Sequence, residues 1–264
     1  MELETLWEGI GLPSQVADLV REQLRSPFPA DAKEAVEGLT HPQTAPDAYR
    51  TLEKVLGGND MAMLACQLQA AAAVHDRYRL LGIPDEIYYD TMKCFSRFLE
   101  ETRRRRGRYV YDRAWWSWRQ VSMTLFRVGA LEYELLPGER AISLHIPSDA
   151  CFSPEDVDRS LAEAGRFFER FFPGRAADHR ICESWLLSPE LGKLLKPGSH
   201  IRSFQSRFRI LREEPENRDF LEWLFGADTD TPPEALPETT SLQRRVKAHL
   251  LEGGRIGAAL GILK

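Results

Sequence analysis

Three side chains in the second half of the sequence could carry out acid–base or nucleophilic chemistry: His145, Cys182 and Glu183. A histidine changes charge near neutral pH, so His145 could take a proton directly or through water, although an imidazole that only hydrogen-bonds within a sheet is the alternative. Cys182 could act as a nucleophile, yet a single buried cysteine more often serves as a small apolar side chain. Glu183 lies in an apolar stretch, where an unpaired carboxylate is costly.

The strand that carries His145 is predicted to form a hairpin with the strand before it. Residues 131–135 and 141–146 both alternate apolar with polar side chains, and the short segment PGER joins them. His145 is expected on the polar side of its strand. Glu132 and Glu134 share one face and could select a cationic acceptor, but we expect them to be solvated surface acids.

The next predicted strand, HRICESWLLS over residues 179–188, is interpreted as buried. Cys182 and Glu183 are neighbours on it and therefore face opposite sides, so only one can point into a shared cleft. Tyr133, Ser184 and Ser188 are candidate acids near such a cleft. The zinc-protease, P-loop, dinucleotide-binding and GxSxG hydrolase motifs are absent, so those classes lack their usual signals.

The elements that position these residues follow from start and stop signals. Apolar spacing predicts helices over 13–26, 47–56, 59–82 and 83–106, of which 59–82 should be the most buried. Ser153-Pro154-Glu155-Asp156 and Ser188-Pro189-Glu190 are strong helix starts. Residues 199–214 are predicted to be one long strand, helices are expected at 217–226 and 241–254, and 255–264 is expected to add an edge strand.

An aromatic segment joins the two halves. Trp115, Trp116 and Trp118 are predicted to lie on a short helix or hinge. A tryptophan cluster can stack on a sugar or a base, but we expect these three to be core residues. The overall prediction is an α+β protein, with a helical N-terminal domain over 1–112 and a mixed α/β sheet domain over 113–264.

Composition restricts the class of partner. Hydrophobic residues make up 43% and charged residues 28% of the 264-residue chain, and the formal net charge is -5, which argues against general nucleic-acid binding. Residues 103–108 contain five arginines that could hold phosphates or a partner, but a solvated helix end is the expected reading. The four cysteines have no CxxC spacing, and no signal peptide or membrane span is recognisable, so a cytoplasmic protein with reduced thiols is expected.

Several segments taken together resemble a known family. LFRVGALEYEL, HIPSDA within residues 142–173, CESWLL and LPETTSLQRRVKAHL resemble bacterial acyltransferase-like proteins that join an N-terminal helical domain to a GNAT-like C-terminal domain. The resemblance extends from about Trp115 to Gly261, and is looser over the first half. It implies a GNAT-like mixed sheet and a direct acyl transfer from acetyl-CoA or another acyl-CoA to a small-molecule acceptor.

The resemblance also implies where the co-substrate would lie. In this fold acyl-CoA enters where two central strands splay apart, and its pyrophosphate is held at a helix N-terminus, which favours anions. The resemblance therefore implies that the residues binding the co-substrate are Ile146, Ser148, Asp149, Ala150 and Ser153. The candidate catalytic residues beside them are His145, Glu183 and Cys182.

One departure from the family keeps an alternative open. The glycine-rich phosphate signature is missing, and Ser148 and Asp149 are among the residues in its place, where Asp149 would repel phosphate. A GNAT-derived binding or scaffold module that has lost acyl-CoA is therefore the alternative to an enzyme. Neither a membrane nor a nucleic-acid partner is expected, and the resemblance leaves a homodimer open.

Overall fold

A computed structural model describes residues 1–264 of the chain. It divides into two compact units, residues 1–128 and residues 129–264. The expected α+β class, with helices first and a mixed sheet afterwards, is confirmed. The domain boundary that the sequence places after residue 112 stays a prediction. None of the helices is both long enough and apolar enough to span a membrane.

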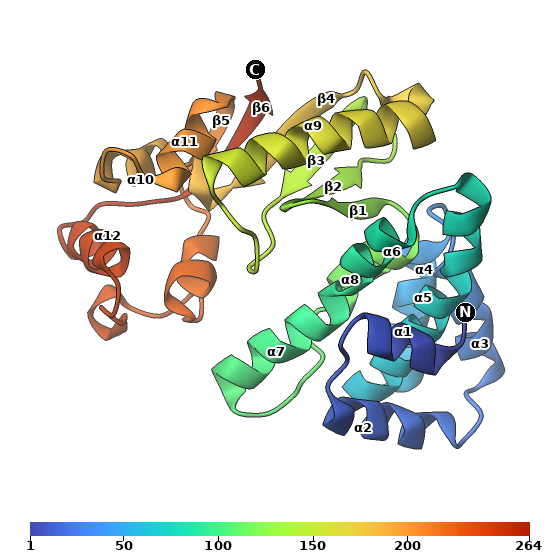
Figure 1. The fold of residues 1–264 in the computed structure, drawn as a ribbon. Coiled ribbons are helices and arrows are strands. Elements are labelled where there is room, and N and C mark those ends of the chain that lie inside the picture. Colours follow the sequence, from blue (N-terminus) through green and yellow to red (C-terminus); the bar gives the residue numbers. More distant parts are fainter. The chain divides into compact units, whose positions relative to one another are not determined.

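The first unit is a bundle of eight helices followed by one short strand (Figure 1). Its elements are α1 (Leu3–Gly9), α2 (Ser14–Leu24), α3 (Ala30–Gly38), α4 (Ala45–Leu56), α5 (Asp60–Leu81), α6 (Asp85–Met92), α7 (Cys94–Arg106), α8 (Ala114–Val121) and β1 (Leu125–Val128). Helix α5 is the most buried of these helices, as predicted, because it carries apolar side chains on all of its sides and 14 of its 22 residues are buried.

Local signals set the ends of α5. The side chain of Asn59 accepts a hydrogen bond from the backbone N–H of Ala62 at 3.0 Å, and Gly82 takes a left-handed conformation at the C-terminus. Gln67, fully buried in the middle of the helix, donates to the carbonyl of Ala114 at 3.0 Å and accepts from the hydroxyl of Tyr111. These bonds fix the segment between α7 and α8 against α5.

The predicted short aromatic helix is α8, but its tryptophans are not core residues. Trp115 is 47% exposed, and Trp116 and Trp118 are only partly buried. The guanidinium of Arg119 lies 4.4 Å from the Trp116 ring centroid and 4.7 Å from that of Trp118. The expectation of a tryptophan core was wrong because the buried side of α8 is formed by smaller residues, among them Ala114 and Val121.

The second unit contains a mixed sheet with helix α9 lying along it (Figure 1). Its strands are β2 (Leu131–Leu135), β3 (Ala141–His145), β4 (His179–Ser184), β5 (Phe208–Glu214) and β6 (Ala258–Leu263), in the order β2-β3-β4-β6-β5. Its α-helices are α9 (Pro154–Phe171), α10 (Pro189–Leu194), α11 (His200–Ser206) and α12 (Ser241–Leu251). Three short 3-10 helices are η1 (Pro173–Arg175), η2 (Trp185–Leu187) and η4 (Pro233–Ala235), and the helix expected at 217–226 is a short π-helix, η3 (Leu221–Phe225).

Three strand predictions needed correction. The segment 179–188 is not one buried strand, because β4 ends at Ser184, only Cys182 of its residues is buried, and η2 follows. The segment 199–214 is not one strand, because its first half forms α11 and only Phe208–Glu214 forms β5. The side-chain amide of Gln205 in α11 donates to the carbonyls of Leu186 and Ser188, at 2.8 and 3.1 Å. The tail is a strand, β6, but it is not at an edge, because it pairs with β4 on one side and β5 on the other.

The helices after β5 form a core of their own. Eight buried apolar residues gather there: Leu191, Leu195, Phe220, Leu221, Phe225, Leu236, Val246 and Ile256. The start of α12 carries a full capping box between Thr240 and Gln243, which satisfies two orphan backbone N–H groups. The segment between β4 and β6 therefore has its own apolar core in addition to the contact between the sheet and α9.

Candidate active site

The two faces of the β2–β3 hairpin have opposite chemistry. Tyr133 pairs with Leu144 across the hairpin, and on this face the hydroxyl of Tyr133 lies 3.0 Å from that of Ser160 in α9. Tyr133 also packs edge-on against Phe168 at 6.2 Å between ring centroids. This face is the apolar contact between the sheet and α9, so its residues hold the fold together.

The opposite face carries acidic groups and an imidazole. Glu132 lies directly across from His145, and Glu134 directly across from Ser143. The Nε2 atom of His145 lies 2.9 Å from a carboxylate oxygen of Glu134. The two glutamates are only 2% and 8% exposed, so the expectation that they are solvated was wrong.

A carboxylate that hydrogen-bonds one ring nitrogen of a histidine fixes the orientation of the ring and stabilises its protonated form. His145 lies on the polar side of its strand, as predicted, and has a carboxylate partner, Glu134, that was not predicted. The signal was present, because the hairpin register brings Glu132 and Glu134 to the face of His145.

The pairing between β3 and β4 stops part of the way along both strands. These parallel strands are paired at Ala141–His179, Ile142–Arg180 and Ser143–Ile181. Beyond that point β3 continues to His145, whereas β4 continues to Ser184 paired only with β6 on its other side. The sheet thus lacks a ladder between its two central strands at the end where the Glu134–His145 pair lies.

Glu183 and Cys182 lie on opposite faces of β4, as predicted from their adjacency. The register places Glu183 on the face of Ser143 and His145, but it is an exposed residue that pairs with Arg212 at 3.4 Å rather than a buried acid. Cys182 is fully buried on the other face, and burial, with a smaller effect of Glu183, raises the pKa of its thiol to about 12. A thiol protonated at neutral pH does not support a nucleophilic role for Cys182.

The predicted cofactor-binding residues lie in one loop between β3 and α9. Ile146 is the first residue after the strand, Ser148 and Asp149 are exposed in a turn, and the N–H of Ala150 closes the turn on Pro147 at 3.0 Å. The loop therefore begins where the β3–β4 ladder has already ended. It leads directly to the N-terminus of α9.

The start of α9 is capped by its own side chains. Ser153 accepts from the N–H of Asp156 at 3.1 Å and donates to the Asp156 carboxylate at 2.6 Å, and the thiol of Cys151 donates to the same oxygen at 2.7 Å. These bonds, that of Cys151 first, lower the pKa of Asp156, so the first turn carries a carboxylate. Arg159 offsets that charge at 3.0 Å. The helix end is therefore less open to an anion than an uncapped end.

The three candidate acids have structural roles. Burial raises the pKa of Tyr133, whose hydroxyl faces α9. Ser184 accepts from the N–H of Leu186, and Ser188 accepts from the N–H of Leu191 at the start of α10. None of these hydroxyls joins the Glu134–His145 pair.

Comparisons with known proteins agree with this architecture. The sequence matches the family models for the N-acyltransferase N-terminal domain over residues 1–123 and the GNAT-like C-terminal domain over residues 104–263. No curated protein matches the chain.

Three similar solved structures are acyltransferases, and each alignment covers 100% of this chain and 99% of the other. One is in complex with decanoyl-CoA and teicoplanin, at 25% identity and a TM-score of 0.72. A second is in complex with CoA and 10C-teicoplanin, at 24% and 0.73. A third is a mutant in complex with octanoyl-CoA, at 24% and 0.72. The similarity therefore extends over both units.

Proposed function

Because the chain belongs to the family with a GNAT-like C-terminal domain, we propose that it transfers an acyl group from acyl-CoA to a small-molecule acceptor. The proposal is supported by similar acyltransferases that were crystallised with CoA, octanoyl-CoA and decanoyl-CoA. The observation that carries it is the place where the β3–β4 ladder ends, because the Glu134–His145 pair lies on the same stretch of the sheet.

Acyl transfer requires a base that takes the proton of the acceptor, and it releases CoA as a thiolate. A nitrogen or oxygen of the acceptor attacks the thioester carbonyl, a bond forms to the acyl carbon, the carbon–sulfur bond breaks, and CoA leaves as its thiolate. His145 would take the proton released by the acceptor, directly or through water, while Glu134 would hold the ring in place. The protonated imidazole is then a source of the proton for the thiolate, so atoms and charge balance.

The loop over residues 146–153 would contact the CoA arm. Its backbone follows the end of β3 that pairs with β2 but not with β4, and it leads to α9, which supports contacts from Ile146, Ser148, Ala150 and Ser153. Asp149 and Asp156 add negative charge here. The guanidinium of Arg207 lies at the first turn of α9, where it donates to Asp158 at 2.8 Å and to the carbonyl of Pro154 at 3.1 Å. We expect the pyrophosphate to be held less tightly than by a glycine-rich loop.

Calorimetric titration tests the co-substrate. Acetyl-CoA, octanoyl-CoA and decanoyl-CoA should each be titrated into the full chain, and at least one should bind with a 1:1 stoichiometry. No heat of binding with any of the three would contradict the proposal. Binding without release of the CoA thiol in the presence of a panel of amines would favour the alternative of a binding module.

A chemical footprint tests the location. Cys151 is exposed and lies in the loop, whereas Cys66, Cys94 and Cys182 are buried and serve as internal controls. Saturating acyl-CoA should slow alkylation of Cys151 by iodoacetamide at pH 8, as followed by peptide mass spectrometry, and pantetheine without the nucleotide should slow it less. An unchanged rate for Cys151 under conditions where acyl-CoA binds would place the co-substrate elsewhere.

A further inference from the structure

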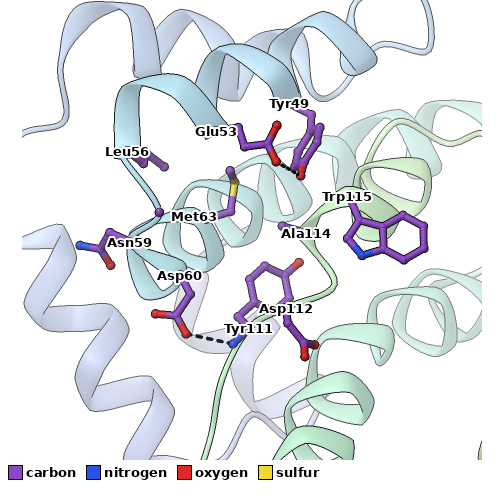
Figure 2. Close-up of a pocket in the computed structure, with 11 residues that line it drawn as sticks. Tyr49, Glu53, Leu56, Asn59, Asp60, Met63, Tyr111, Asp112, Ala114 and Trp115 are labelled. Carbon is purple, nitrogen blue, oxygen red and sulfur yellow. Dashed lines mark hydrogen bonds between the residues drawn. The ribbon is translucent and has the colours of Figure 1, made fainter. Parts of the chain in front are cut away.

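The helical unit contains a pocket of its own, of about 230 Å³. It is formed by α4, the start of α5, the segment that joins α7 to α8 and the start of α8 (Figure 2). This volume is smaller than the roughly 300–1,000 Å³ of pockets for drug-sized ligands, so the pocket fits a small molecule or one group of a larger one. All residues that line it belong to residues 49–115.

Three aromatic side chains form much of its wall: Tyr49, Tyr111 and Trp115 (Figure 2). Tyr111 is fixed, because its backbone N–H donates to the carboxylate of Asp60 at 3.1 Å and its hydroxyl donates to Gln67. Trp115 is 47% exposed, so its ring lies where the pocket meets solvent. An aromatic face presents negative potential and attracts a cation.

Three carboxylates line the same pocket, and no lysine, arginine or histidine does: Glu53, Asp60 and Asp112. One oxygen of Asp112 already pairs with Arg105 and Arg106, at 3.0 and 3.2 Å, and its other oxygen, which makes no hydrogen bond, lies 4.0 Å from the guanidinium of Arg113. Glu53 accepts only from a neutral donor, the hydroxyl of Tyr49, at 2.7 Å. Glu53 and Asp60 are therefore the two carboxylates of the pocket that have no cationic partner.

We propose that this pocket binds a small organic cation, a primary or methylated ammonium group attached to a short apolar body. A carboxylate supplies a charge-assisted hydrogen bond to the ammonium, and the aromatic rings cover its carbon atoms. Leu56, Met63 and Ala114 complete an apolar wall for the body of the ligand. The proposal does not depend on acyl transfer, because the pocket lies within the helical unit alone.

Nuclear magnetic resonance of the full chain tests the ligand class with benzylamine as the probe and benzyl alcohol as its neutral analogue. The indole N–H signal of Trp115, assigned from the Trp115→Phe variant, should shift on addition of benzylamine. The affinity for benzylamine should exceed that for benzyl alcohol about tenfold. Equal affinities, or no shift of the Trp115 signal with either probe, would overturn the proposal.

Two variants test the role of charge. Glu53→Gln keeps the hydrogen bond to Tyr49 but removes the charge, and should weaken benzylamine binding about tenfold without changing the melting temperature. Asp47→Asn is the matched control, because Asp47 lies on the same helix, pairs with Arg50 and does not line the pocket. Equal effects of the two variants on affinity would contradict a site at Glu53.

Discussion

The two faces of the β2–β3 hairpin differ in what they contribute, although both are buried. The α9 face, with Tyr133 and Leu144, makes packing contacts and one hydroxyl pair with Ser160. The other face buries Glu132 and Glu134 beside His145, and burying a carboxylate costs free energy unless it is paired. Buried acids persist where they are paired or used, so this face is the one we associate with chemistry.

The largest expected effect comes from removing the imidazole on the polar face. His145→Gln should lower kcat about 10²- to 10⁴-fold, because a positioned general base contributes roughly that factor. Release of the CoA thiol is the measurement. Acyl-CoA affinity should change little, and an unchanged kcat would remove His145 from the mechanism.

On the α9 face, the expected effect is on stability. Phe168→Ala removes a fully buried ring that packs on Tyr133, and should cost about 3–5 kcal/mol in the free energy of unfolding. Urea unfolding measures this loss. The fraction of protein that stays folded should keep the kcat of the wild type, and a kcat as low as that of His145→Gln would erase the distinction between the faces.

A smaller effect is expected from the partner of the imidazole. Glu134→Gln keeps a hydrogen bond to His145 but removes the charge that holds the ring and stabilises its protonated form. We expect kcat to fall about tenfold, with KM for acyl-CoA unchanged. Glu183→Gln is the control, since Glu183 is exposed and pairs with Arg212. Equal losses for both variants would assign no special role to Glu134.

The smallest effect concerns the hydroxyl of Tyr133. Tyr133→Phe should cost about 0.5–1.5 kcal/mol at pH 7, since it removes one buried hydrogen bond to Ser160. Burial raises the pKa of Tyr133, so the folded state keeps a proton that the unfolded chain loses near pH 10. The free energy of unfolding should therefore fall as the pH rises above about 10, and less steeply in Tyr133→Phe. The free energy of unfolding is measured with urea at pH 7, 9 and 10.5. The same fall with pH in the wild type and in Tyr133→Phe would contradict this.

Local signals in the sequence predicted elements well. The caps at Ser153 and Ser188, and the buried helix that begins after Asn59, depend on residues within a few positions of each other. The long-range pairing of β6 between β4 and β5 could not be predicted, because nothing near the tail indicates its neighbours. The strand prediction for residues 199–206 was wrong for a related reason. The side chain of Gln205 makes long-range hydrogen bonds to the carbonyls of Leu186 and Ser188, and these favour a helix there.

The positions of the candidate site residues were predicted in part. The sequence placed His145 on the polar side of its strand and Glu183 opposite Cys182, but it assigned Glu132 and Glu134 to solvent. Alternation within one strand identifies which residues share a face, and it does not identify what covers that face. Burial of both glutamates is a tertiary property, which explains why the partner of His145 was missed.

The most direct test of the account is hydrogen–deuterium exchange of the full chain with and without decanoyl-CoA. The account predicts that the amides of Leu144 to Ile146 and of the loop to Ser153 become protected, while the β2–β3 turn over residues 136–140 does not change. Binding of decanoyl-CoA with no added protection in residues 144–153 would contradict the claim that acyl-CoA lies where the β3–β4 ladder ends.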